Sequence, residues 1–437
     1  MELPRRLRAG RVRGLGAVVA IAVVASGVQL YRAHNVRVPL LSAAVVIGDG
    51  GRLLALGPAD GAALFPGTRV LRRTELAAAA REQIRWLGAG RVPGTGGRYD
   101  DMVRTALLDL RTLTTADGAS LAGWPQAWRY VWPRDAAFVA VALARTGHAD
   151  DALGVLRYLQ NLQAPDGSFQ ARYLPDGTGR VPDARGEESD GPAWALWAAE
   201  QVALAVPARS RSSVAGSLRS LVTRSSARLL DVTASPSVLP APSLDYWEIK
   251  DDRLSLGTVA PMAVGLRSAA ALTALLGGDP RGVTARAAAL ERAVEQVFGP
   301  DGYPRYAGDD RPDISVAFLL PPFRAACAGP VLGAWRAARQ SLRRPAGGLA
   351  PGAGWKDDGI SWTAETAVFA LTAATTGDRS SAERYLTWLD GHRTDRGALP
   401  EKVLSNGDPA GPAPLAWTAA LVVLAVDALA RPPAACA

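Results

Sequence analysis

The sequence predicts an all-α fold, a closed toroid of six helical hairpins, behind a short β-type segment and an N-terminal signal or anchor helix. From Thr74 onward apolar residues recur at helical spacing, and Pro, Gly and Asp clusters interrupt them. A helix, a short Gly-containing link and a second helix recur around 146–148, 277–279 and 376–378. Such hairpins must stack to bury their apolar faces, and six of them take about 340 residues. The stretch 74–430 supplies that length.

The helical spacing gives a specific set of segments, each within the normal length of a globular helix. We expect helices near 74–88, 99–113, 134–146, 149–163, 190–205, 210–231, 257–276, 281–297, 313–327, 330–343, 361–376, 379–391 and 413–430. The loops between hairpins carry most of the Trp, Asp and Glu residues discussed below, so we expect these loops to form a site at one end of the toroid.

The N-terminus has the composition of an export signal. Residues 1–14 are rich in arginine, and the apolar run Leu15 to Val28 follows them. A charged region before an apolar run of this length is typical of a secretory signal or a signal anchor, and the arginines keep that end in the cytoplasm. We expect residues 1–33 to be a signal peptide or membrane anchor. The rest is then extracytoplasmic at the cell membrane, or secreted if the segment is cleaved.

Residues 34–73 differ from both neighbours. They contain short β-type runs, and Gly-Asp-Gly-Gly at 48–51 is typical of a hairpin turn. The segment is too short to be a domain, so we expect a small β element packed on a catalytic domain that spans 74–437.

Composition excludes several classes of protein. The 49 Lys and Arg residues exceed the 41 Asp and Glu residues by 8, but the only dense basic run is N-terminal, so no nucleic-acid partner is expected. Cys327 and Cys436 are the only cysteines, which excludes a disulfide framework or a cysteine metal cluster and leaves a single bridge open. The three histidines are scattered, so neither a metal site nor a cofactor is expected.

The stretch Tyr130 to Leu143, YVWPRDAAFVAVAL, predicts a loop that becomes a buried helix. Its Arg134 and Asp135 stand at the helix start, close to Trp132 and two further aromatic residues. Charged groups beside aromatic faces suit a pocket for sugar hydroxyls. The alternative is a buried ion pair that only fixes the helix start.

Three later loops carry further candidates. Asp190 precedes a helix in GEESDGPAWALW, as a helix cap or as a pocket residue. In SLDYWEIKDD, Asp245 and Glu248 flank Tyr-Trp, and a carboxyl partly desolvated by an indole has the raised pKa that a general acid needs. Glu401 lies in the loop GALPEKV and is a candidate second carboxylate. Two such carboxyls are the machinery of glycoside hydrolysis, whereas solvated loop acids are the alternative.

Five motifs occur together over residues 100–430. They are YVWPRDAAF, QAPDGSF, ESDGPAWAL, DYWE, and LPEKV with PLAWT. In order and spacing they resemble the glucoamylase family of glycoside hydrolases (family 15), which also includes glucodextranases and some bacterial trehalases. The resemblance implies an (α/α)6 barrel and an inverting reaction, with acid and base about 6.5 to 9.5 Å apart.

The resemblance also implies roles for individual residues. Glu248 would be the general acid and Glu401 the base that activates water. The remaining residues that we expect to bind substrate are Trp132, Arg134, Asp135, Asp190, Asp245, Trp247 and Trp417, with Asp245 orienting the acid or the sugar.

The sequence departs from the family pattern at three places. Residues 34–73 can hold only a remnant of the β-sandwich domain that many members carry before the barrel. Ile249 stands where fungal members have a second Glu after the acid. The family has an Arg-Tyr pair before the eleventh helix, but 347–362 contains no arginine and Arg305-Tyr306 lies too early, so Trp355 or Asp357 is expected to line that side.

These observations predict an exo-acting inverting hydrolase that releases glucose from an α-glucan or oligosaccharide. Two alternatives stay open. One is a trehalase with a pocket closed at both ends, and the other is a catalytically silent glycan-binding envelope protein on the same scaffold. The expected partners are an oligosaccharide or polysaccharide substrate and, through an uncleaved N-terminal helix, the membrane.

Overall fold

The structure is a computed structural model that describes residues 37–325, 327–434 and 436. The expected signal or anchor helix at 1–33 lies outside the described residues. One described helix, Leu256–Leu275, is long and apolar enough to cross a membrane, but 67% of its most apolar 18-residue stretch is buried inside the protein. It is a wall of the barrel described next, which explains its apolar character.

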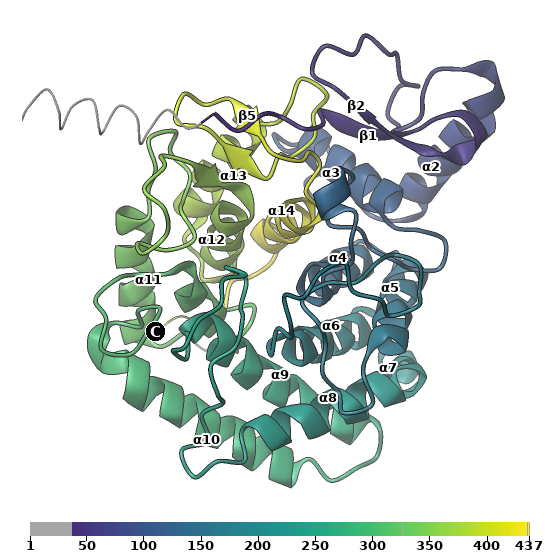
Figure 1. Cartoon of the computed structure of the whole chain (residues 1–437). Coiled ribbons are helices and arrows are strands. Elements are labelled where there is room, and N and C mark those ends of the chain that lie inside the picture. The colour runs from purple at the N-terminus through teal and green to yellow at the C-terminus, as the bar shows by residue number, and fades with distance from the viewer. Residues whose placement is uncertain (1–36, 326, 435, 437) are drawn as a thin grey trace, which may run out of the picture.

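Six elements form the inner ring of a closed barrel (Figure 1). They are α4 (Pro133–Arg145), α6 (Gly191–Ala205), α9 (Leu256–Leu275), the 3-10 helix η5 (Ile314–Leu319), α12 (Thr363–Thr375) and α14 (Ala416–Leu429). Each packs against the next, and α14 packs against α4 to close the ring. Every residue of α12 before Thr375 is buried. A helix that is apolar all round is one that has neighbours on every side, as these inner helices do.

Six outer helices each pair with an inner element. They are α3 (Asp100–Leu113), α5 (Ala149–Leu162), α8 (Arg219–Val232), α10 (Arg281–Phe298), α11 (Gly329–Ser341) and α13 (Arg379–Gly391). These helices are amphipathic: α10, for example, buries Leu290, Val294 and Phe298 on one face. The six outer and inner pairs confirm the predicted (α/α)6 barrel.

Three expected helices differ from the structure. The segment 210–231 forms two helices, α7 (Ala208–Ser217) and α8, because Leu218 leaves the helical conformation and turns its side chain into the core. The segment 313–327 gives only the short η5, since Pro321 and Pro322 lack the N–H groups needed to continue it. The segment 74–88 forms η2 (Thr74–Leu76) and α2 (Ala77–Ala89), which lie outside the ring against α3.

Aromatic residues fill the centre of the barrel. The ring centroids of Phe138 and Trp197 lie 4.8 Å apart, and those of Trp194 and Phe318 lie 5.0 Å apart. Phe323 contacts all four of these rings. Each such pair adds about 0.5 to 1.5 kcal/mol beyond the burial of its area.

The connections differ at the two ends of the barrel. Short links such as 146–148 and 376–378 lead from an inner helix to the next outer one. Long loops lead from each outer helix to the next inner element at the other end: 114–132, 163–190, 233–255, 299–313, 342–362 and 392–415. All six long loops therefore meet above the N-terminal ends of the inner helices, which explains why motifs far apart in the sequence gather there. Four of them contain short helices or strands: η3 (Gln126–Trp128), η4 (Gly299–Asp301), and the three strands of one sheet, β3 (Ser361–Trp362), β4 (Lys402–Val403) and β5 (Pro409–Ala410).

The segment before the barrel contains the expected hairpin. Strands β1 (Ala44–Ile47) and β2 (Leu53–Leu56) are antiparallel with Ile47 opposite Leu53, and the turn η1 (Asp49–Gly51) lies between them. Gly50 and Gly51 have positive φ, the conformation that this turn requires. The hairpin lies beside α2 and α3 in Figure 1, and the amide of Leu41 donates to the carbonyl of Gly411 at 2.8 Å.

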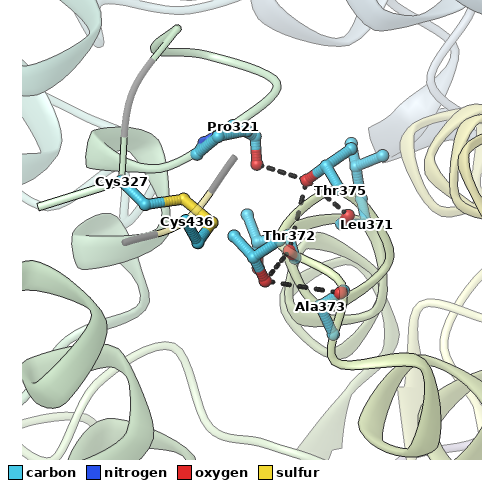
Figure 2. The surroundings of a disulfide bond; sticks show 8 residues. Pro321, Cys327, Leu371, Thr372, Ala373, Thr375 and Cys436 are labelled. Carbon is cyan, nitrogen blue, oxygen red and sulfur yellow. Dashed lines mark hydrogen bonds between the residues drawn. A yellow bond between two sulfur atoms is a disulfide. The ribbon is translucent and has the colours of Figure 1, made fainter. Parts of the chain in front are cut away.

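The two cysteines form a disulfide at the end of the barrel opposite the long loops. Cys327 lies in the link from η5 to α11, and Cys436 lies 109 residues later near the C-terminus. Figure 2 shows the bond beside the C-terminal part of α12, where the Thr375 hydroxyl donates to the carbonyl of Pro321 at 2.5 Å. The bridge left open by the sequence is therefore present.

Candidate active site

Two adjoining cavities open at the end where the long loops meet. The deeper one, here called the inner chamber, has a volume of about 90 Å³, and the outer one, called the vestibule, has about 340 Å³. The residues that line both are Trp128, Trp132, Tyr246, Glu248, Trp362, Glu365 and Glu401. Because the two cavities share so many walls, they form one pocket with a narrow end and a wide end.

Glu248 is held at the junction of the two cavities. Its backbone has φ of +54°, in the left-handed region, and its amide donates to the carbonyl of Asp245 at 2.7 Å to close a tight turn. The side chain accepts a 2.8 Å hydrogen bond from Nε1 of Trp132 and forms an ion pair with Arg185. A non-glycine residue with positive φ costs folding energy, and such residues concentrate at functional sites.

A buried network fixes the loop that carries Glu248. Asp245 accepts hydrogen bonds from the Trp247 amide at 3.0 Å and from the Ser255 hydroxyl at 2.6 Å. Arg305 lies 2.9 Å from the same carboxylate, and its guanidinium stacks 3.8 Å from the centre of the Trp247 ring. Asp245 and Arg305 therefore hold the loop from behind.

Glu401 lies on the loop before β4, and its side chain is 12% exposed. Nε1 of Trp128 donates to Oε1 at 3.1 Å, and Nζ of Lys402 lies 2.8 Å from Oε2. A donor and a cation both stabilise the ionised carboxylate. Gly411 has φ of +75°, which favours glycine, and a Cβ there would lie 2.9 Å from Oε2 and displace the carboxyl.

The first turn of α4 contributes Arg134 and Asp135 to the inner chamber. Arg134 is buried, lies 2.9 Å from Glu188 and 3.4 Å from Asp135, and stacks 4.9 Å from the ring of Trp417. Burial raises the pKa of Asp135 to about 6, against the opposing effect of Arg134. The chamber therefore presents charged hydrogen-bonding groups on one wall and an indole face beside them.

Glu365 is a third carboxyl in the pocket, and it is absent from the residues predicted above. It stands in the first turn of α12, is 4% exposed, and its Oε2 has no hydrogen-bond partner among the described residues. Burial raises its pKa to about 8, and the charge of Glu401 acts in the same direction. Glu365 is therefore neutral at pH 7 and can donate a hydrogen bond.

A signal for Glu365 exists in the sequence. It is the only charged residue in the helix TAETAVFALTAAT. An acid inside an otherwise apolar helix must be buried, and buried acids are candidates for function.

The predicted substrate-binding residues lie in two layers, the lining of the pocket and a layer behind that lining. Trp132, Arg134, Asp135 and Trp417 line the inner chamber, and Trp247 lines the vestibule. Asp190 and Asp245 lie behind this lining.

Asp190 does not cap α6 with its side chain, because its Oδ2 instead accepts a hydrogen bond from Nε1 of Trp194 at 2.9 Å. Trp355 lines the vestibule as expected, whereas Asp357 faces outward and pairs with Arg344 at 3.0 Å. Within the described ranges, no group of three or more His, Cys, Asp or Glu side chains could hold a metal ion.

Comparison with solved structures places the fold among those of glycosidases. A wild-type glycosidase is 20% identical, with a TM-score of 0.64 over 76% of this chain and 96% of its own. A bacterial glucoamylase complexed with acarbose is 16% identical, with a TM-score of 0.64 over 79% of this chain and 57% of its own. A family 15 glucoamylase from Hypocrea jecorina is 16% identical, with a TM-score of 0.58 over 82% of this chain and 73% of its own.

No protein-family model and no curated protein sequence matches the chain. At these identities the structural likeness establishes a glucoamylase-like (α/α)6 fold.

Proposed function

We propose that this chain, which has the fold of the glucoamylases, is an inverting exo-acting glycoside hydrolase that releases glucose from the non-reducing end of an α-glucoside. The observation that carries the proposal is the placement of Glu248 and Glu401 on the same pocket, each bound by the Nε1 of a different tryptophan. A protein that only bound glycans would not need two carboxyls fixed on one pocket.

The two carboxyls have environments that suit different roles. Nζ of Lys402 lies 2.8 Å from the Glu401 carboxyl and Trp128 donates to it, an arrangement that suits a base that takes a proton from water. Glu248 stands where the inner chamber meets the vestibule, so it can protonate an oxygen that links a sugar in the chamber to a group in the vestibule. Water then attacks the anomeric carbon as the bond to that oxygen breaks.

The size of the inner chamber supports exo action. Its volume is about 90 Å³, and Ala122, Leu415 and Trp417 are among the residues that close it. The pocket narrows toward these residues, so a terminal sugar fits at the narrow end and a continuing polymer chain does not. Arg134 and Asp135 then bind hydroxyls of that sugar, since charge-assisted hydrogen bonds are the strong ones.

The names of the structural neighbours support the same class of reaction. They include glycosidases and glucoamylases, one solved with acarbose and one glycosidase variant solved with glucose. The disulfide between Cys327 and Cys436 supports export, because disulfides persist in oxidising compartments.

The test is to incubate the full chain separately with maltooligosaccharides, isomaltooligosaccharides and trehalose, and to follow the anomer of released glucose by NMR. Initial β-glucose would identify both the inverting mechanism and the linkage. Release from trehalose alone would favour the trehalase. Sugar binding without release from any of the three would favour the silent scaffold and overturn the proposal.

A further inference from the structure

Two arginines stand on the vestibule wall next to Glu248. Arg172 and Arg185 line the vestibule together with Glu248. Arg172 is nine-tenths buried, stacks 5.0 Å from the Trp132 ring, and its Nε has no hydrogen-bond partner among the described residues. Arg185 is 36% exposed and reaches Oε2 of Glu248. This wall is therefore cationic and accessible from the wide end of the pocket.

When Glu248 is protonated, the positive charges of Arg172 and Arg185 exceed the negative charge of the carboxylate that pairs with them. Asp183 pairs with both Arg172 and Arg185, and it neutralises one of the two positive charges. On the opposite side Glu401 is matched by Lys402, and Glu365 is neutral. Arg134 also lies 3.7 Å from Glu248, but it has carboxylate partners of its own in Glu188 at 2.9 Å and Asp135 at 3.4 Å. Arg172 and Arg185 share the single charge of Asp183, so one of their two positive charges has only Glu248 as a further partner.

The contact of Arg185 with Glu248 conflicts with the role of a general acid. An acid must carry a proton, whereas a guanidinium beside a carboxylate stabilises the ionised form. Catalysis therefore requires that Arg185 bind another anion while the substrate is in place. That anion must reach the vestibule, where the leaving group lies if the terminal sugar fills the inner chamber.

The other polar groups of the vestibule are mainly donors. Nε1 of Trp247, Trp355 and Trp362 is buried in each case and has no hydrogen-bond partner among the described residues. Buried donors without acceptors are costly, and a ligand rich in acceptor oxygens would satisfy them. These donors call for acceptor oxygens, and Arg172 and Arg185 on the same lining add the preference for an acceptor that carries negative charge.

From these contacts we propose that the preferred substrate is an α-glucoside whose leaving group carries an anion, a carboxylate or a phosphate, that binds Arg185 and Arg172. This inference rests on the proposed hydrolase function. The anion draws Arg185 away from Glu248, which then takes up a proton. Hydrolysis converts glucosyl–O–R and water to glucose and HO–R: Glu248 gives its proton to the leaving oxygen, and Glu401 takes one from water.

The test uses a matched pair of substrates, (α-D-glucopyranosyloxy)acetate and (α-D-glucopyranosyloxy)acetamide, which differ in charge and hardly in size. The wild-type full chain should have a kcat/KM about tenfold or more higher for the acetate, the effect of one charge-assisted hydrogen bond. A third substrate, 2-(α-D-glucopyranosyloxy)ethyl phosphate, shows whether phosphate is preferred to carboxylate.

Variants of the same loop provide the controls. Arg185→Gln should remove the preference by lowering the rate on the acetate and raising the rate on the acetamide, and Arg185→Lys should retain part of it. Arg180→Gln should keep the wild-type preference, because Arg180 is exposed and pairs with Asp176. A merely structural role of Arg185 would lower both rates together.

Two outcomes overturn the inference. They are equal rates on the acetate and the acetamide in the wild type, or an unchanged preference in Arg185→Gln. Either would leave the hydrolase function intact. Failure to cleave any α-glucoside would instead overturn the proposed function itself.

Discussion

Nε1 of Trp132 donates a 2.8 Å hydrogen bond to Oε1 of Glu248, so a residue that lines the pocket also positions the candidate acid. Trp128 has the same relationship to Glu401 at 3.1 Å. Both tryptophans come from the loop between α3 and α4, whereas the two acids come from different loops. One loop therefore contacts and positions both acids in the pocket.

The two functions of Trp132 can be separated by substitution. Trp132→Phe keeps an aromatic face but removes the N–H donor, so we expect kcat to fall about tenfold while sugar affinity changes little. Trp132→Ala also removes the face and should weaken glucose binding about tenfold or more. Steady-state kinetics and calorimetric titration with glucose measure these effects. Unchanged glucose affinity in Trp132→Ala would place the sugar elsewhere.

Glu248→Gln and Glu401→Gln should each reduce hydrolysis by at least about a hundredfold, because each removes one proton-transfer group. Both should still bind glucose, since the amide has nearly the shape of the carboxyl. Glu187→Gln is the matched control, because Glu187 is 38% exposed and pairs with Arg228 outside the pocket. Substantial activity in both pocket variants would contradict the assignment of these residues.

The barrel was predictable because its helices repeat a simple pattern. Inner helices such as α9 and α14 are apolar on every side, whereas outer helices such as α10 are apolar on one side. The spacing of apolar residues therefore predicts the alternation of outer and inner helices along the chain. The break at Leu218 was not predictable, since it depends on the space that a buried side chain finds in the core. The inner position of η5 likewise depends on the neighbouring helices.

Site residues that belong to a motif at a helix start could be predicted from the sequence. Residues that reach the site only because distant loops meet could not. Arg134 and Asp135 were found because they follow aromatic residues and a proline at the start of α4. Arg185 lies in a polar loop that resembles many solvated loops, and only the fold brings it to Glu248. The residues around Asp245 are typical of a pocket, so the sequence predicted that it binds substrate. Its ion pair with Arg305 and its hydrogen bond from Ser255 instead hold it behind the lining.

Glu365 should make stability depend on pH in a specific direction. Its pKa is about 8 in the folded protein and 4.5 when unperturbed. Between these values the folded state holds a proton that the unfolded chain releases, so this carboxyl increasingly destabilises the fold as pH rises from 4.5 to 8. Glu365→Gln cannot ionise, and it should be more stable than the wild type at pH 8 by about 3 to 5 kcal/mol, with little difference at pH 4.5.

Urea unfolding of wild type and Glu365→Gln at both pH values measures this difference. Glu187→Gln again serves as the control, because an exposed carboxyl should show no such trend. If Glu365→Gln is no more stable than the wild type at pH 8, then Glu365 is ionised in the folded protein and cannot donate a hydrogen bond to the sugar.

The disulfide should stabilise the fold without affecting the site. It closes a loop between residues 109 apart in sequence, at the end of the barrel away from the pocket. Closing a loop of this size restricts the unfolded chain, so Cys436→Ser should lose about 3 to 5 kcal/mol of unfolding free energy. Below its unfolding transition its kcat/KM should match the wild type. Dithiothreitol should destabilise the wild type by a similar amount and leave Cys436→Ser unchanged, whereas an equal effect on both proteins would show that the reductant acts elsewhere.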